Sequence, residues 1–448
     1  KYALVDHSKF DLDYDWSIGE IPIRVAGNVY NVNVYHSTLP ESYVEIYFID
    51  SPHFYNRNHI YTTDIDEDER FILFSKAVIE SLQRLKWKPD VIHCNDWQTG
   101  LIPLYIKDNY AWDKFFETVA TVITIHNIGY QGRFSPASLS KAEIRSELFY
   151  LNSPVETMGE VNFLKTGLMF ADAINTVSET YAKEIMTYEY GSGLDGVLHY
   201  RAKDFRGIVN GVDYSVWNPE TDKHIPFHFS VGDLSGKLEN KKVLLKKMRL
   251  PFHENIPLIG IVSRLVSQKG FDLLENSINE LMEINAQWII LGSGEERYEE
   301  LFRSMAFSFP DKVSVYLGFN NGLSHLIEAG SDIFLMPSIY EPCGLNQIYS
   351  LRYGTVPVVR KTGGLADTVH DWNNSLEEGE GAGNGFTFDE PNSEELISTV
   401  NRAVSYFNNK IIWNKIIRNG MIKNYSWDFS ANKYLELYKH AISNRRKS

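Results

Sequence analysis

Short apolar runs that end in polar, glycine-containing turns constrain the fold of the C-terminal half of this chain most strongly. The run Ile333–Pro337 leads into the turn Ser338–Leu345, after which residues 346–353 have a helix-like pattern. Glu341 therefore lies, with a proline and a glycine, where a buried strand passes into a helix. Backbone N–H groups at such a turn attract phosphate oxygens, and a neighbouring carboxylate accepts hydrogen bonds from sugar hydroxyls. This segment predicts a site for a sugar nucleotide.

Three similar turns follow apolar runs in the same half of the chain. They are Ser263–Gly270 after Pro257–Val262, Leu291–Gly294 after Trp288–Ile290, and Lys361–Leu365 after Val356–Val359. Ligands of an open parallel sheet bind beyond the carboxyl ends of its strands. The four turns together predict one crevice in which Arg264 and Lys269 supply positive charge. Gly363 and Gly364 would allow a close backbone approach to the ligand.

Size and charge limit the classes of protein to which the chain can belong. Its 448 residues exceed one ordinary core and predict at least two domains. No apolar run approaches the roughly 18 residues that span a bilayer, so no membrane partner is expected. The formal charge of −14 argues against nucleic acid as a partner. A neutral polymer is compatible with this acidic surface.

The order of apolar patterns predicts an α/β fold. Strand-like runs alternate with helical patterns throughout, which is typical of parallel layers. In the first half, Tyr43–Ile49, Val91–Cys94 and Val119–Ile125 indicate strands, and Phe71–Leu85 indicates a helix with one apolar face. Near the end, Trp427–Ser443 has a helical pattern.

The polar stretch 221–255 interrupts the apolar pattern and is interpreted as the domain boundary. We therefore expect an N-terminal domain over residues 1–220 and a C-terminal domain over residues 221–426. The segment Ser375–Gly385 is rich in glutamate and glycine, and it predicts a mobile surface loop.

Two polar segments of the first half also follow predicted strands. His126 ends the run Val122–Ile125, and Asp96 precedes Trp97 after the strand at residues 91–95. A histidine at a strand end suits a binding cleft, although it could equally hydrogen-bond a neighbouring loop. The Asp–Trp pair could be purely structural, because aspartate readily caps turns. For Arg264 and Lys269 the alternative is a solvated salt bridge, but their position after a buried strand favours function.

Several patterns that would indicate a cofactor or a metal fail on closer reading. Asp64–Asp66 matches a short acidic metal motif, but it precedes a helix, where capping explains it more simply. Gly292–Gly294 begins like a dinucleotide fingerprint, whose third glycine is replaced by Arg297. Two cysteines cannot form a four-ligand zinc site, and Cys343 is interpreted as a small residue that fits its turn. No metal and no cofactor are expected.

Seven ordered segments, distributed over nearly the whole chain, carry a resemblance to a known family. They are His93–Gln98, Thr124–Asn127, Phe163–Gly167, Asn210–Asp213, Ser263–Gly270, Glu341–Leu345 and Lys361–Thr368. In these segments the chain resembles bacterial glycogen synthases and plant starch synthases, which are retaining glucosyltransferases. The resemblance implies two Rossmann-like domains that face a central cleft, the GT-B arrangement. It also implies a C-terminal helix, residues 427–448, that returns to the N-terminal domain.

The resemblance implies transfer of glucose from ADP-glucose or UDP-glucose to the non-reducing end of an α-1,4-glucan, in the bacterial cytoplasm or the plastid stroma. Arg264 and Lys269 would neutralise the donor diphosphate, and Glu341 would accept glucose hydroxyls. His126 would line the sugar site, and Asp96 would lie nearer the acceptor. The choice of base would depend on contacts near Gly318 and Phe319. The remaining nucleotide-sugar contacts would come from Asn162, Asn210, Cys343, Gly344, Leu345, Thr362, Gly363 and Gly364.

Two departures from the family pattern leave alternatives open. The family begins with a strand and a Lys-Thr-Gly-Gly-Leu loop, whereas this sequence starts after that region, so roughly 40 residues are expected to be missing. Asn346 stands where the family has threonine, with little effect expected. One alternative is therefore a glucan- or nucleotide-binding paralogue with little catalysis. Another is a different sugar-nucleotide enzyme, such as a sucrose-type synthase or an epimerase.

Overall fold

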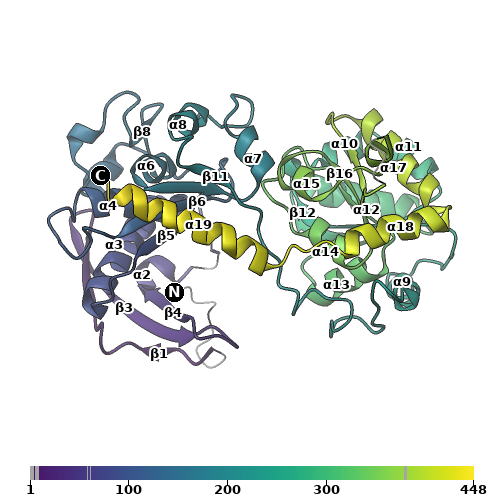
Figure 1. Cartoon of the computed structure of the whole chain (residues 1–448), viewed down its shortest axis with the longest axis horizontal. Coiled ribbons are helices and arrows are strands. Elements are labelled where there is room, and N and C mark those ends of the chain that lie inside the picture. Colours follow the sequence, from purple (N-terminus) through teal and green to yellow (C-terminus); the bar gives the residue numbers. More distant parts are fainter. Residues whose placement is uncertain (1–4, 6–9, 58, 61, 378–380, 448) are drawn as a thin grey trace. The chain divides into compact units, whose positions relative to one another are not determined.

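The structure is a computed structural model that describes residues 5, 10–57, 59–60, 62–377 and 381–447. The chain divides into two compact units, whose elements are labelled in Figure 1. Unit 1 comprises Lys1–Thr176, Glu184–Arg206 and Leu435–Ser448, and unit 2 comprises Val177–Lys183 and Gly207–Tyr434.

A four-stranded sheet forms the centre of unit 1. Its strands are β5 (Val91–Asn95), β6 (Ala120–Ile125), β10 (Ala173–Thr176) and β11 (Phe205–Gly207), in the order β11-β10-β6-β5. The pairs β5–β6 and β6–β10 are parallel. Every residue of β6 is buried, as expected for a parallel strand covered on both faces. The strands predicted from the apolar runs at residues 91–94 and 119–125 are thereby confirmed.

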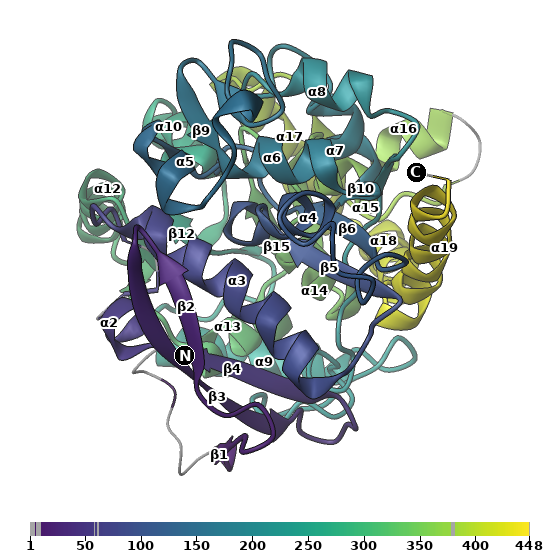
Figure 2. The ribbon, with the colours of Figure 1, turned by 90° about the vertical axis from the view of Figure 1, so that its left-hand side faces the viewer.

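An antiparallel sheet precedes this parallel sheet. It contains β1 (Asp13–Tyr14), β2 (Ile21–Val25), β3 (Asn28–Thr38) and β4 (Glu45–Asp50). Strand β2 alternates buried and exposed residues, and helix α3 (Glu67–Leu85) packs on it (Figure 2). The predicted strand and helix in this region are confirmed, although α3 starts four residues earlier than its apolar pattern. Three acidic residues in its first turn suit the positive end of the helix.

The remaining elements of unit 1 are short. The strands are β7 (Arg133–Phe134), β8 (Glu156–Thr157) and β9 (Glu160–Asn162), and the helices are α2 (Pro52–Tyr55), α4 (Ile102–Lys107), α5 (Ala137–Lys141), α6 (Phe163–Phe170) and α8 (Asp195–Tyr200). Helix α7 (Glu179–Glu184) belongs to unit 2 up to Lys183.

The acidic motif before α3 is occupied by ion pairs. Arg57 contacts Asp64 at 2.6 Å and Asp66 at 2.5 Å. Asp66 occupies the N-cap position of α3, but its side chain accepts no capping hydrogen bond. The expected capping role is therefore wrong for this side chain, because the guanidinium of Arg57 holds both carboxylates instead.

Unit 2 contains a doubly wound six-stranded sheet whose neighbouring strands all pair in parallel. The strand order is β14-β13-β12-β15-β16-β17, which corresponds to the order 3-2-1-4-5-6 of dinucleotide-binding folds. Alternate residues of β12, β13, β15 and β16 enter two separate apolar clusters, so helices cover both faces of the sheet. The strands are β12 (Leu258–Leu265), β13 (Gln287–Gly294), β14 (Val313–Leu317), β15 (Ile333–Met336), β16 (Val356–Arg360) and β17 (Phe386–Phe388).

Two predicted turns of unit 2 begin inside strands. Strands β12 and β13 stay paired up to Leu265 and Gly294, so Arg264 and Gly292–Gly294 are strand residues. The helices are α9 (Ser235–Lys247), α10 (Phe271–Glu275), α11 (Ile278–Glu283), α12 (Glu296–Ser308), α13 (Asn321–Gly330), α14 (Asn346–Arg352), α15 (Gly363–Thr368), α16 (Trp372–Glu377), α17 (Ser393–Phe407) and α18 (Lys410–Met421).

The mobile loop predicted over Ser375–Gly385 is wrong in its described parts. Residues 375–377 complete α16, and residues 378–380 lie outside the described residues. The backbone carbonyls of Gly381 and Gly383 both accept hydrogen bonds from the side chain of Asn419. The glycine and glutamate content suggested a loop free of such contacts, whereas hydrogen bonds from Asn419 connect its backbone to α18.

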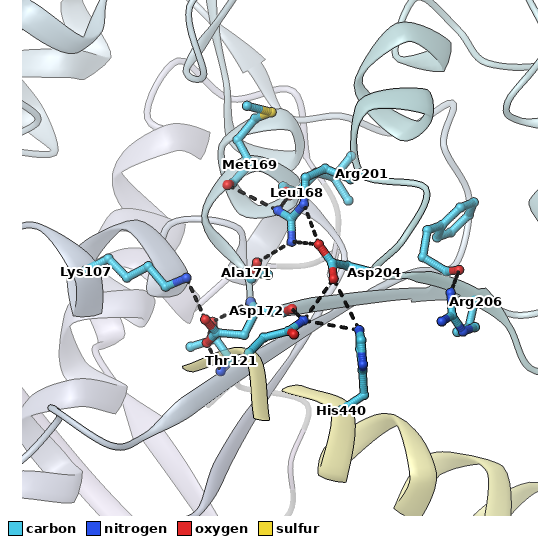
Figure 3. Close-up of polar contacts among 12 residues, drawn as sticks. Lys107, Thr121, Leu168, Met169, Ala171, Asp172, Arg201, Asp204, Arg206 and His440 are labelled. Carbon is cyan, nitrogen blue, oxygen red and sulfur yellow. Dashed lines mark hydrogen bonds and ion pairs between the residues drawn. The ribbon is translucent and has the colours of Figure 1, made fainter. Parts of the chain in front are cut away.

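The C-terminal helix α19 (Trp427–Arg445) belongs to unit 1 from Leu435 onward. The side-chain amide of Asn444 donates to the backbone carbonyl of Asp172 and to the carboxylate of Asp204, and His440 lies 3.2 Å from Asp204 (Figure 3). Arg201 also pairs with Asp204. These contacts confirm that the C-terminal helix returns to the N-terminal part of the chain. None of the helices in the described part of the chain combines the length and the hydropathy of a transmembrane segment.

His93 connects α19 to the sheet of unit 1 and predicts an acid-sensitive stability. Its ring nitrogens contact Tyr438 at 2.9 Å and Thr124 at 2.6 Å, and burial lowers its pKa to about 4. The neutral ring is therefore favoured in the folded state. The contribution of the neutral ring to the free energy of unfolding is complete above pH 6.5. It is lost as the pH falls toward 4, and the loss amounts to at most about 3 kcal/mol.

We expect His93→Gln to flatten the decline of the unfolding free energy between pH 6.5 and 4.5, as measured by urea unfolding. His199→Gln, at an exposed histidine, is the matched control and should keep the parent's decline. Equal slopes for His93→Gln and the parent would show that the ring does not carry the effect.

Candidate active site

The strands β12 and β15 diverge at the topological switch point of unit 2, where such sheets bind ligands. The chain leaves β12 through a turn at Ser267–Lys269 and then Gly270, whose φ is +75°. A Cβ at Gly270 would lie 1.9 Å from the carbonyl oxygen of Pro337. Only glycine permits this contact, which brings the turn after β12 against the turn after β15.

Arg264 lies beside Ser293 at the end of β12 and is exposed. Among the described residues its guanidinium has no carboxylate partner and donates no hydrogen bond. A free guanidinium at the carboxyl edge of a parallel sheet is available to an anionic ligand.

Lys269 and Glu341, predicted as separate ligand contacts, are paired with each other. The ammonium of Lys269 lies 2.5 Å from the carboxylate of Glu341, which is only 5% exposed. The hydroxyl of Ser338 donates to the same carboxylate oxygen at 3.0 Å. Burial of the carboxylate beside this cation fixes both groups at the switch point.

The loop after Glu341 offers unused backbone donors. Gly344 has a φ of +69°, and within the described part of the chain the N–H groups of Gly344 and Leu345 have no acceptor. The side-chain amide of Gln347 donates to the carbonyls of Cys343 and Gly344 and to the hydroxyl of Thr368. The loop is thus held by its carbonyls while two N–H groups stay available to an anion.

Cys343 and Asn210 meet in this loop. Burial raises the pKa of Cys343 to about 12, and the backbone N–H of Asn210 hydrogen-bonds its thiol. The thiol is therefore a poor nucleophile, in agreement with its interpretation as a small residue that fits the turn. Asn210 also lines a cavity of about 170 Å³ with Asp367 and Lys433.

Thr362, Gly363 and Gly364 are buried against the same loop. A Cβ at Gly363, where φ is +45°, would lie 1.9 Å from the carbonyl oxygen of Glu341, and one at Gly364 would lie 2.1 Å from that of Cys343. The close approach that these glycines allow is therefore to the protein's own backbone. Their contact with a diphosphate stays a prediction.

Asp96 and His126 come together at the sheet edge of unit 1. The carboxylate of Asp96 accepts the backbone N–H of His126 at 2.7 Å. Burial raises the pKa of Asp96, while the charge of His126 opposes that rise. Trp97 is 9% exposed and packs against Phe71 and Phe134, so its structural interpretation is supported.

Asn162 is fully buried and serves as the N-cap of α6. Its side-chain oxygen Oδ1 accepts a hydrogen bond from the backbone N–H of Lys165 at 2.9 Å. Its side-chain Nδ2 donates to the side-chain oxygen of Gln131 at 2.7 Å. These bonds account for the residue within the fold, and a sugar contact would have to replace them.

Two residues of interest escaped placement by sequence reasoning. Phe319 follows β14 at the same edge of the sheet in unit 2, and its side chain is 90% exposed. Asn95 lies at the end of β5, and its amide oxygen is 2.9 Å from Nε2 of His126. The only available signals were an aromatic residue after an apolar run and a polar residue before Asp96.

Comparison with known proteins gives the family. The model of the starch synthase catalytic domain matches residues 2–200, and that of the glycosyl transferases group 1 matches residues 245–418. The glycogen synthase of Thermosipho africanus is 45% identical over 415 residues, 92% of this chain and 84% of the relative. The glycogen synthase of Thermotoga maritima is 45% identical over 412 residues, again 92% and 84%.

Solved structures agree with these sequence matches. The catalytic domain of starch synthase IV from Arabidopsis thaliana, bound to ADP and acarbose, has a TM-score of 0.91 at 34% identity, over 99% of this chain and 91% of that chain. A sucrose-phosphate synthase from Thermosynechococcus elongatus shares the fold alone, with a TM-score of 0.55 at 17% identity, over 86% of this chain and 81% of that chain. The protein is a glycosyltransferase of the GT-B fold that belongs to the glycogen and starch synthase family.

Proposed function

We propose that this enzyme transfers glucose from ADP-glucose, or alternatively UDP-glucose, to the non-reducing end of an α-1,4-glucan. The observation that carries the proposal is the arrangement at the switch point of unit 2. There a free guanidinium, Arg264, lies on the same sheet edge as the ion pair of Lys269 with the buried Glu341. Glycogen synthases align with most of the chain, and the starch synthase IV structure contains ADP. These relatives support ADP-glucose as the donor.

The positive side chains act on the leaving group. When the bond from glucose C1 to the phosphate oxygen breaks, negative charge grows on the diphosphate. Lys269 is held in place by Glu341 before the reaction, so it stabilises that charge with little reorganisation, and the exposed guanidinium of Arg264 supplies a second positive charge. The N–H groups of Gly344 and Leu345 add two donors for the same anion. Metal and cofactor are no part of this proposal, since side chains supply the positive charge.

Other groups of the site bind the sugar and the base of the donor. The carboxylate of Glu341 accepts hydrogen bonds from glucose hydroxyls, and the exposed ring of Phe319 stacks on the base. Asn210, Cys343, Thr362, Gly363 and Gly364 border the donor.

In unit 1, His126 contacts the transferred glucose and Asp96 serves the acceptor. Asn162 supports this edge by capping α6.

Retention of the anomeric configuration follows from a same-face substitution. The bond from C1 to the donor phosphate breaks while the bond from C1 to the acceptor hydroxyl oxygen forms on the same face. The departing phosphate takes the proton of that hydroxyl. This route needs no carboxylate nucleophile. A glucosyl–protein adduct trapped and detected by mass spectrometry would contradict it.

A primer-extension assay tests the function. The purified chain is incubated with malto-oligosaccharide and radiolabelled ADP-glucose or UDP-glucose, with EDTA present. We expect longer α-1,4-linked chains that carry the label, made faster from ADP-glucose. Donor binding without extension would favour the alternative of a binding paralogue, and a labelled product other than glucan would indicate a different sugar-nucleotide enzyme. The matched relatives are consistent with the bacterial cytoplasm or the plastid stroma as the location.

A further inference from the structure

The imidazole of His126 is held by a side chain that has no role in the proposed function. Nε2 of His126 lies 2.9 Å from the amide oxygen of Asn95. Both residues are exposed, and Asn95 pairs in register with Thr124 on the neighbouring strand. The ring is therefore fixed across the two strand ends, β5 and β6, rather than by its own loop.

An unusual backbone conformation creates this contact. Asp96, which directly follows Asn95, has φ 57° and ψ −172°, a region that is occupied almost only by glycine. Such a conformation costs about 1–3 kcal/mol when a side chain is present. Hydrogen bonds from the N–H of Asp96 to Thr124 and from the N–H of His126 to Asp96 hold it in place. The turn lets the consecutive residues Asn95 and Asp96, at the end of β5, both contact His126, which directly follows β6.

The chemistry of the contact determines which ring nitrogen carries the proton. An amide oxygen only accepts hydrogen bonds, so Nε2 of His126 must be the donor. In the neutral ring Nδ1 then keeps a free lone pair. Among the described residues Nδ1 has no partner, so it is available to a hydroxyl group of a ligand.

We propose that Asn95 is a positioning residue that holds His126 as the Nε2–H tautomer and thereby presents Nδ1 to a hydroxyl of the transferred glucose. The proposal rests on the function proposed above, because it needs a sugar at His126. Asn95 itself touches no substrate. It acts by fixing the plane of the ring and the position of its proton.

The test compares Asn95→Leu, which keeps the side-chain size and removes the acceptor, with Asn28→Leu. Asn28 is an exposed strand residue whose side chain makes no hydrogen bond within the described residues, so the same substitution there is the control. Asn95→Asp keeps an acceptor oxygen in the same place. The tautomer is measured by ¹⁵N NMR of histidine-labelled full-length chain, and His126→Gln assigns the signal.

We expect a protonated Nε2 in the parent, in Asn95→Asp and in Asn28→Leu, and a mixed tautomer in Asn95→Leu. Loss of this one hydrogen bond should lower kcat of glucan extension by Asn95→Leu about tenfold. The KM for ADP-glucose should stay within about twofold, because donor binding is dominated by other groups.

A protonated Nδ1 in the parent would overturn the proposal, as would an unchanged tautomer in Asn95→Leu. A changed tautomer with an unchanged kcat would overturn the link to catalysis. Absence of extension by the parent would instead refute the proposed function, while the NMR signals would still decide whether Asn95 sets the tautomer.

Discussion

Lys269→Ala should lower kcat for glucan extension by about 1,000-fold, because a preorganised cation at the growing diphosphate charge is removed. The variant should also lose stability. Its substitution leaves the carboxylate of Glu341, which is 5% exposed, without its cation, at a cost of about 3 kcal/mol or more. The measurement is initial rates with saturating ADP-glucose, together with circular dichroism and urea unfolding to quantify the folded fraction.

Two controls separate catalysis from folding. Lys242→Ala removes a half-exposed lysine that pairs with Glu239 on the same helix and should change neither rate nor stability appreciably. Lys269→Arg keeps a cation beside Glu341 and should recover more stability than activity, since the two cations differ in shape. A folded Lys269→Ala chain with a turnover close to that of the parent would refute the assignment.

Arg264→Ala should lower kcat/KM for ADP-glucose about 100-fold while the free energy of unfolding stays within about 0.5 kcal/mol of the parent. The reason for this contrast with Lys269 is structural. Arg264 is exposed and, in the described part of the chain, has no ion-pair partner. Its removal therefore leaves no buried charge without a partner. Steady-state kinetics and urea unfolding on the same preparation check both halves of the prediction.

The matched control for Arg264 is Arg303→Ala. Arg303 is exposed on α12 and pairs with Glu299 one helical turn away, so its loss should leave kcat/KM unchanged. An unchanged kcat/KM in Arg264→Ala would mean that the free guanidinium does not meet the donor.

The sequence predicted which turns lie at one edge of the sheet, but it did not predict which side chains pair with each other there. The apolar runs before Ser263, Ser338 and Lys361 predicted three strands that the structure contains. Because parallel strands end on one edge, the grouping of their turns followed from topology alone. The ion pair between Lys269 and Glu341 did not follow, since it joins residues far apart in sequence and depends on how two turns pack.

The glycines after β16 have a second neighbour that the sequence does not show. Gly363 and Gly364 are predicted to admit a diphosphate, and their missing Cβ atoms also make room for the carbonyls of Glu341 and Cys343. A sequence shows that a glycine permits close approach without showing what approaches. The same limit explains the wrong loop at Ser375–Gly385, where Asn419 binds the backbone.

In unit 1 the decisive feature is a backbone conformation that composition does not encode. Asp96 adopts a positive φ without being glycine, and this turn brings Asn95 to His126. Propensity rules predict against such a residue, so Asn95 was passed over. The capping role of Asn162 was missed for a related reason, since a polar residue before a helix is as readily a cap as a ligand contact.

The central claim is that the switch point of unit 2 holds a nucleoside diphosphate through Arg264 and Lys269. Isothermal titration calorimetry of ADP and AMP into the parent and into the Arg264→Ala/Lys269→Arg double variant tests it most directly. The account predicts that the parent binds ADP at least about tenfold more tightly than AMP, and that this preference largely disappears in the variant. Equal affinities for ADP and AMP in the parent, or an undiminished preference for ADP in the variant, would contradict it.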